Sequence, residues 1–138
     1  MQKRVLGSAV CLTLMLASVR VAGHHSFSAE FDANSPVNLS GTVVKVDWIN
    51  PHMWLYVDVK TPDGKVEHWR VEGGGPNALV RRGLTKLALP IGTPIIITGY
   101  RAWDGSMTAN GNSLIFPDGR RLFMGSSGTG APGDPEKQ

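Results

Sequence analysis

The sequence predicts an all-β domain, a small OB-like Greek-key barrel of five to six strands with one short helix between strands three and four. Two observations predict this fold. Alternating and β-branched segments recur between residues 37 and 124, and a short helical segment follows the third of them. An immunoglobulin-like β-sandwich is the alternative, although it would not need that helix and would more often contain seven short strands.

The first three strands are separated by turn residues. Val37–Trp48 is the first predicted strand, with Gly41 as a bulge or bend, and the dipeptide Asn50-Pro51 ends it. His52–Lys60 follows as a second strand with clean period-two alternation, which places Met53 and Leu55 on the apolar face. The third strand, Val66–Glu72, completes a hairpin with the second.

The hairpin turn fixes the register of these two strands. Thr61-Pro62-Asp63-Gly64 predicts a three-residue loop with a left-handed glycine. A one-residue slip would set Val57 against Arg70 and mix the two faces. The predicted pairs are Val57–Trp69 and Leu55–Val71 on the apolar face, and Asp58–His68, Tyr56–Arg70 and Trp54–Glu72 on the polar face.

The second half of the domain contains the helix and the remaining strands. Three glycines and a proline, residues 73–76, lead into the helix, and their spacing favours a tight connection over a phosphate loop. The expected elements are a helix at Ala78–Arg82, a turn at Thr85–Leu89, a strand at Thr93–Tyr100, a turn at Asn110-Gly111 and a last hairpin of Ser113–Phe116 with Arg121–Met124. Residues 37–124 form the domain, and the Gly-, Ser- and Pro-rich tail 125–138 is expected to be disordered.

Residues 1–23 have the pattern of a secretory signal peptide. A positive start, an apolar run and a small-residue cleavage site follow one another. A retained membrane anchor is the alternative, but Arg20 cuts the run below the about 20 apolar residues that a span needs. We expect cleavage after Gly23, export to the periplasm or the medium, no remaining membrane span, and an N-terminal arm at residues 24–36.

Cleavage changes the composition of the protein. The whole chain has 14 Lys and Arg against 11 Asp and Glu, a formal charge of +3. Lys3, Arg4 and Arg20 belong to the signal, so the mature chain is formally neutral. A neutral domain argues against nucleic-acid binding, which needs a basic face. Cys11 also leaves with the signal, which excludes a disulfide or thiol chemistry in the mature protein.

The predicted N-terminus suggests a metal site. A mature chain starting at His24 could chelate a metal through its α-amine and imidazole together, and His25 or His52 could add a further imidazole. Nitrogen ligands in a planar array favour copper. The candidate metal ligands are therefore His24, His25 and His52, and the other interpretation is that the His pair is only a polar start after the cleavage site.

Aromatic residues suggest a second site. Trp54 and Tyr56 share the polar face of the second strand with Arg70 opposite, and Trp48 ends the first strand. In OB-like barrels ligands often bind at this face, and Trp suits stacking. The alternative is that the arm covers these residues through Phe27 and Phe31, which would also bring His24 or His25 towards His52.

No nucleophile or acid–base pair is identifiable, so the sequence predicts a binding protein rather than an enzyme, although an open copper site leaves redox chemistry possible. The leading hypothesis is an exported protein that binds copper through its N-terminal histidine. The alternative is an OB-type ligand-binding or adaptor domain that needs no metal. A metal ion, a small ligand or a periplasmic protein is the expected partner.

Several motifs together resemble a family of small secreted bacterial proteins of unknown function. They are His24-His25-Ser26-Phe27, Glu30-Phe31-Asp32, Gly41-Thr42-Val43, Asn50-Pro51-His52, Val71-Glu72-Gly73-Gly74 with Pro76-Asn77, and Pro117-Asp118-Gly119-Arg120 to Phe123. The resemblance covers His24 to about Gly125. It implies export in a Gram-negative bacterium and an OB-like fold, and it implies no activity. Gly23 departs from the Ala that usually precedes the His pair.

Overall fold

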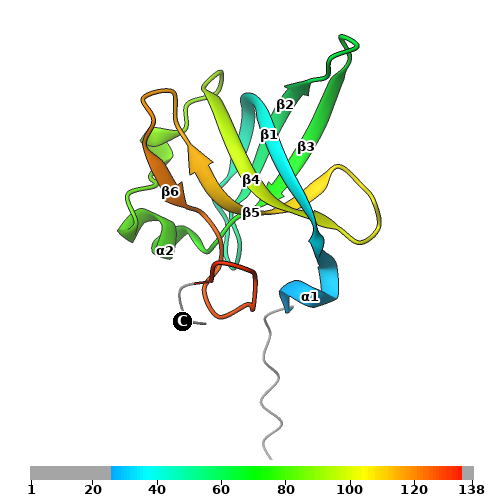
Figure 1. Ribbon diagram of the computed structural model, residues 1–138. Coiled ribbons are helices and arrows are strands. Elements are labelled where there is room, and N and C mark those ends of the chain that lie inside the picture. The colour runs from blue at the N-terminus through cyan, green and yellow to red at the C-terminus, as the bar shows by residue number, and fades with distance from the viewer. Residues whose placement is uncertain (1–25, 135–138) are drawn as a thin grey trace, which may run out of the picture.

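The protein forms a closed barrel, seen here in a computed structural model that describes residues 26–134 (Figure 1). Its strands are β1 (Phe31–Asp47), β2 (Trp54–Lys60), β3 (Val66–Glu72), β4 (Pro94–Ala102), β5 (Thr108–Ile115) and β6 (Arg121–Phe123). They form one sheet in the order β3-β2-β1-β4-β5-β6, and a parallel pairing of β3 with β5 closes β1 to β5 into a ring. This confirms the OB-like barrel and excludes the sandwich, in which two sheets face one another.

Short helices lie outside the barrel. They are α1 (Phe27–Glu30), α2 (Pro76–Arg81) and the 3₁₀ turn η1 (Lys86–Ala88). The last two lie between β3 and β4, as expected. Pro76 suits the first turn of α2, and Gly83 follows the helix with a φ of 92°. Within residues 26–134, no helix has the length and hydropathy needed to cross a membrane.

The hairpin of β2 and β3 has the predicted register, because its turn closes as expected. Thr61 N–H donates to the carbonyl of Lys65 at 2.9 Å, and Gly64 has a φ of 85°. All five predicted pairs occur. The apolar face is buried at Leu55, Val57, Trp69 and Val71, which belong to the main core.

Strand β1 differs from its prediction at both ends and in the position of its bulge. It starts at Phe31, six residues earlier than expected, because residues 31–42 pair with β4 while residues 41–47 pair with β2. Residues 31–36 of the predicted arm are therefore strand, and Phe27–Glu30 is the short helix α1. The register shift with β2 lies between Val43 and Lys45, so of the bulge or bend predicted at Gly41 the bulge is wrong. Gly41 instead permits close strand contact, since a Cβ there would lie 2.6 Å from the carbonyl oxygen of Asp58.

The turn predicted at Asn110-Gly111 is also wrong, because both residues lie inside β5. Asn110 pairs with Tyr100 of β4 and with Glu72 of β3, so tertiary pairing overrides the local turn preference. A Cβ on Gly111 would lie 2.7 Å from Sδ of Met124, which explains why glycine suits this strand.

The C-terminal segment, defined as residues 125–134, is packed rather than disordered. Ala131 is 4% exposed and Asp134 is 1% exposed. Ala131 packs against Phe27 and Phe31 in a second small core, beside α1 beneath the barrel (Figure 1). The composition predicted disorder there because it shows no local periodicity, but contacts with distant residues order it. The predicted signal peptide, His24, His25 and residues 135–138 lie outside the described residues.

Candidate functional site

His52 lies just before β2 in a nearly closed polar environment, its side chain 18% exposed. Its Nδ1 lies 2.9 Å from Oε1 of Glu72, 3.2 Å from the carbonyl oxygen of Gly73 and 3.0 Å from Oγ of Ser126. The Glu72 side chain is 10% exposed, so the imidazole and the carboxylate form a mostly buried pair. The cis Asn50–Pro51 bond immediately precedes His52.

The contacts of His52 determine which ring nitrogen carries the proton. A carboxylate and a carbonyl accept hydrogen bonds and donate none, so Nδ1 is the protonated nitrogen. In the neutral ring the lone pair is then on Nε2. Histidines that bind metals commonly show this arrangement, with one nitrogen donating to a carboxylate and the other suited to the metal.

Glycines bring the C-terminal segment close to this pair. Gly73 N–H donates to Met53 at 2.8 Å and Gly74 N–H donates to Met124 at 2.7 Å. A Cβ on Gly74 would lie 2.7 Å from the carbonyl oxygen of Gly125. A side chain at this position would therefore push away the segment that carries Ser126. The glycine run serves close backbone packing, which agrees with its interpretation as a tight connection.

Ser126, His52 and Glu72 do not form a catalytic triad. In a triad the hydroxyl and the carboxylate contact opposite ring nitrogens, so that the base can take the hydroxyl proton. Here both contact Nδ1. Ser126 therefore anchors the C-terminal segment to the imidazole and is not activated by it.

A series of hydrogen bonds connects His52 to the start of the described chain. Ser126 contacts the imidazole, its carbonyl accepts from Oγ1 of Thr129 at 3.3 Å, and the carbonyl of Thr129 accepts from Phe27 N–H at 3.0 Å. His24 precedes Phe27 by three residues, which can extend about 10 Å. Phe27, the third residue after His24 in the sequence, is thus linked through the C-terminal segment to His52.

Within residues 26–134, no three His, Cys, Asp or Glu side chains converge into a metal-binding group. His52 and Glu72 supply two neighbouring ligand types, and a complete set would need groups from other parts of the chain. His68 takes no part in this arrangement. Its Nδ1 lies 2.6 Å from Oδ1 of Asp58 and its side chain is 78% exposed, which confirms the predicted cross-strand pair.

The four predicted ligand-binding residues do not line one cleft. Trp54 and Arg70 lie together, with the guanidinium carbon 4.4 Å from the ring centroid. Tyr56 is instead covered by Lys45, whose Nζ lies 4.8 Å from its ring centroid. Trp48 packs partly buried against the main core. Only two of the four therefore line a common cleft.

That cleft, here called the Trp54–Arg70 cleft, has a volume of about 310 Å³. Its remaining walls come from the N-terminal segment, including Phe31, and from the β4–β5 connection, including Trp103 and Asp104. The phenylalanines of the arm do not cover Trp54. Phe27 and Phe31 dock on each other at 5.9 Å and Phe27 packs edge-on to Tyr100 at 5.5 Å, so the cleft remains beside them.

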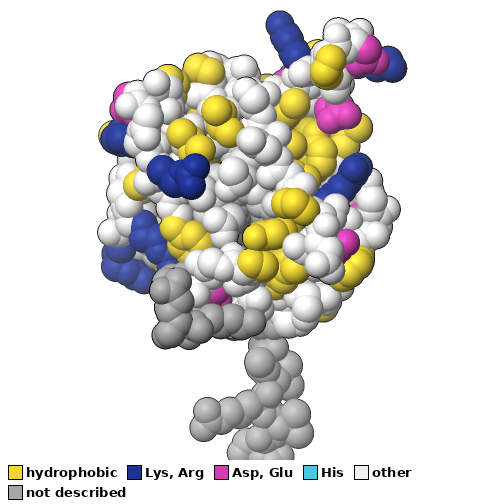
Figure 2. All heavy atoms as spheres, in the orientation of Figure 1, with side chains coloured by type: hydrophobic (Ala, Val, Ile, Leu, Met, Phe, Trp, Pro, Cys, Tyr) yellow, Lys and Arg dark blue, Asp and Glu magenta, His cyan; other side chains and the backbone are white. Residues whose placement is uncertain are grey.

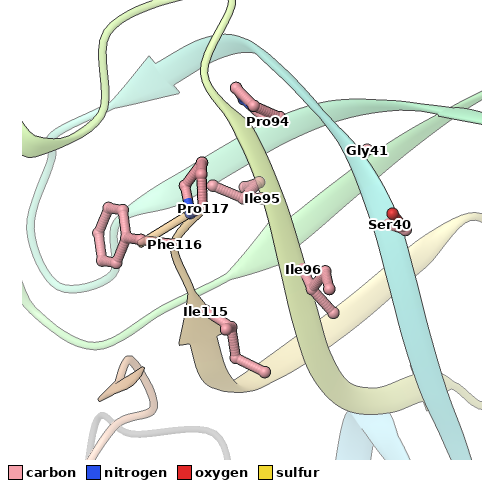
Figure 3. A pocket seen from close by; sticks show the side chains of 8 residues that line it. All are labelled: Ser40, Gly41, Pro94, Ile95, Ile96, Ile115, Phe116 and Pro117. Atoms are coloured by element: carbon pink, nitrogen blue, oxygen red, sulfur yellow. The ribbon is translucent and has the colours of Figure 1, made fainter. Parts of the chain in front are cut away.

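A second hollow lies on the outer side of the barrel between β1, β4 and the end of β5. Figure 3 shows Ile95, Ile96, Ile115, Phe116 and Pro117 around it. Its volume is about 230 Å³ and its lining contains no titratable side chain. This groove has no group for acid–base or metal chemistry, and none of the predicted site residues line it.

Charged side chains are scattered over the visible face, most of them near its edges (Figure 2). Lys and Arg gather at the lower left over α2, which carries Arg81 and is followed by Arg82. Arg82 is engaged within the protein, because its guanidinium donates to the carbonyl of Gly125 and to Ser127. Part of the positive charge over α2 is therefore used in contacts within the protein.

Sequence reasoning missed Glu72, Ser126, Trp103 and Asp104 as site residues. For Glu72 a signal existed, because the derived register sets it opposite Trp54, and His52 lies two positions along the same face. For Asp104 the sequence gives only a turn signal, because Gly105 follows it. Ser126 had no signal, since its approach to His52 depends on the path of the C-terminal segment.

The chain was compared with known proteins. A family model described as a family of unknown function (DUF6152) matches residues 12–111. Neither the curated proteins nor the solved structures gave a match. The matched segment contains the Asn50-Pro51-His52 and Glu72-Gly73-Gly74 motifs, and it ends within β5, before the Pro117–Phe123 motif. Since the match spans well over half of the sequence, the chain belongs to this family of unknown function, DUF6152.

Proposed function

We propose that this protein is exported by a Gram-negative bacterium, is cleaved after Gly23, and binds copper through its new N-terminus. His24 supplies its α-amine and imidazole, His52 supplies Nε2, and His25 is available as a further imidazole. Nitrogen donors of this kind suit Cu(II). The observation that carries the proposal is the series of contacts from Phe27 through Thr129 and Ser126 to His52.

The buried pair of His52 and Glu72 supports the same proposal. Glu72 fixes the tautomer and the ring orientation of His52, as an outer-shell carboxylate does in metal sites. A buried ion pair adds little net stability, because the cost of removing both groups from water offsets their attraction, so the pair is better explained by a task than by stability. The role proposed here is to present one imidazole towards the N-terminal arm.

The test uses the exported protein recovered from a bacterial host. Its intact mass should correspond to a chain beginning at His24, and a competition titration should give one Cu(II) per protein. Loss of an outer-shell partner weakens metal binding by about 10–100-fold. Because His52 is proposed as a direct ligand, we expect His52→Ala to weaken copper binding by more than that.

Two variants complete the experiment. His68→Ala is the matched control, because it removes an exposed imidazole elsewhere on the barrel and should leave copper binding unchanged. Glu72→Gln keeps the shape of the pair but removes its charge, and should weaken copper binding by about 10–100-fold. A mature chain that starts at another residue, or equal binding by His52→Ala and His68→Ala, would contradict the proposal.

A second candidate function needs no metal. In it the barrel is an OB-type binding or adaptor domain that takes a small ligand on its Trp54–Arg70 side. The observation that favours it is the cleft in which these two residues meet the β4–β5 connection. Loss of ligand binding in Trp54→Ala would support it, and unchanged binding in that variant would remove its basis.

A further inference from the structure

Trp103 presents an exposed indole whose position is fixed by the N-terminal segment. The side chain is 59% exposed, yet its Nε1–H donates to the carbonyl of Ser28 at 3.1 Å and its backbone N–H donates to the carbonyl of Glu30 at 3.0 Å. A large exposed aromatic ring normally loses mobility only when it binds something. In this protein two hydrogen bonds already fix the indole before any ligand binds. Binding to this ring would therefore cost little conformational entropy.

The loop that follows Trp103 is also held in one conformation. Arg101 donates from Nε to Ser106 at 3.0 Å and from Nη2 to Gly105 at 2.6 Å. The backbone N–H of Ser106 donates to Oδ1 of Asp104 at 2.9 Å. Arg101 also stacks over Trp69, with 5.3 Å between the guanidinium carbon and the ring centroid. The second wall of the cleft is therefore rigid as well.

The floor of the cleft supplies polar groups. The guanidinium of Arg70 lies over the Trp54 ring, so this cation–π contact helps to position it. Thr108, the β5 partner of Arg70, brings a hydroxyl into the lining. Asp104 lines the opposite wall, and Arg70 and Arg101 help to lower the pKa of its carboxyl after the hydrogen bonds from Ser106.

The charges of this lining balance one another. Glu30 and Asp104 face the same cleft as Arg70, and Arg101 is bonded to the loop beside it. A phosphate or carboxylate ligand would meet two carboxylates, and a cation would meet the guanidinium groups. The lining instead offers paired donors and acceptors around an apolar ring surface, which suits a ligand with several hydroxyl groups and one apolar face.

We propose that the Trp54–Arg70 cleft binds a neutral saccharide, which stacks on Trp103 and hydrogen-bonds through its hydroxyl groups to Arg70 and Asp104. This inference rests on the second candidate function and specifies its ligand class. The volume of about 310 Å³ lies at the lower end of the roughly 300–1,000 Å³ typical of small-molecule sites.

The test measures tryptophan fluorescence and calorimetric titration of the mature protein with neutral trisaccharides, namely maltotriose, cellotriose and triacetylchitotriose. We expect at least one of them to bind saturably. Trp103→Ala should weaken that binding by about tenfold, the upper part of the range for an aromatic contact. Leu87→Ala is the control, because it shortens a side chain that is 91% exposed outside the cleft and should leave binding unchanged.

Further arms separate the ligand class from the binding function. Trigalacturonate, the chitosan trimer and indole-3-acetate test anionic, cationic and aromatic ligands. Tighter binding of any of these than of the neutral sugars would overturn the saccharide assignment while leaving the cleft a binding site. Absence of binding by every probe would overturn both. Asp104→Asn replaces an exposed loop side chain, so it tests the cleft even if Trp103→Ala does not fold. Equal saccharide affinity of both variants and the wild type would refute the proposal.

Discussion

Arg82 is the main link between α2 and the C-terminal segment, and its removal should loosen the arrangement that holds His52. The guanidinium donates from Nη1 to the carbonyl of Gly125 at 2.8 Å and from Nη2 to Oγ of Ser127 at 2.5 Å. It also lies 4.9 Å from the ring centroid of Phe123. These contacts flank Ser126 on both sides.

The expected cost of Arg82→Ala follows from these contacts. Hydrogen bonds with a charged partner contribute about 1.5–3 kcal/mol, and a cation–π contact at a partly exposed position adds about 0.5–1 kcal/mol. Gly125 is buried, so its carbonyl would lose a partner without gaining water freely. We expect the free energy of unfolding to fall by about 2–4 kcal/mol and the Tm by roughly 8–20 °C.

Urea and thermal unfolding of the mature protein measure this loss, and hydrogen exchange at the Phe27 amide reports on the C-terminal segment. Arg81→Ala is the matched control, since Arg81 is the exposed neighbour on the same helix and should change the free energy by about 0.5 kcal/mol or less. If the two variants agree within about 0.5 kcal/mol, Arg82 does not hold the segment, and the reasoning is refuted.

Three further predictions concern the barrel. Gly99→Ala should destabilise the protein by about 2 kcal/mol or more in urea unfolding, because a Cβ would overlap a backbone carbonyl of β5 that cannot move independently; wild-type stability would contradict this close packing. The side-chain hydrogen bond with Arg120 lowers the pKa of Asp118, so its contribution to stability is present above the ordinary carboxyl pKa near 4 and is lost as the pH falls below it. Asp118→Asn should therefore lose less stability between about pH 5 and pH 2 than the wild type, and a parallel decline would contradict the pairing. His68→Ala should cost less than about 1 kcal/mol because its pair with Asp58 is exposed, and a larger loss would show that the pair is structurally important.

Local chemistry predicted the parts of the fold whose structure is decided locally. The turn at Thr61–Gly64 determines the hairpin register, so every pair between β2 and β3 could be derived. The helix between strands three and four has its own signals in Pro76 and Gly83. In contrast, the start of β1 at Phe31 depends on pairing with Ala102, a contact between distant residues that no local pattern indicates.

The same distinction applies to the site. His52 is a candidate ligand from its residue type and position alone, and the register contained the signal for its contact with Glu72. The positions of Ser126 and Thr129 depend on a segment whose composition is typical of disorder, and they are ordered by Arg82, Asn112 and Phe27, which are distant in sequence. Trp103 was missed because its exposed ring follows a strand and shows no periodicity of its own.

The most direct test of the account is the copper affinity of the mature protein compared with that of the same protein carrying three additional alanines before His24, a length that places neither His24 nor His25 third in the chain, where a histidine forms a new copper chelate with the amine and two amides. The extension leaves the barrel and His52 unchanged. It converts the α-amine of His24 into a peptide nitrogen, so the amine and the imidazole of His24 can no longer chelate a metal together. A competition titration should show affinity at least about 100-fold lower for the extended protein, since it loses a direct ligand rather than an outer-shell partner. Equal affinities of the two proteins would contradict the claim that the amine of His24 binds the metal.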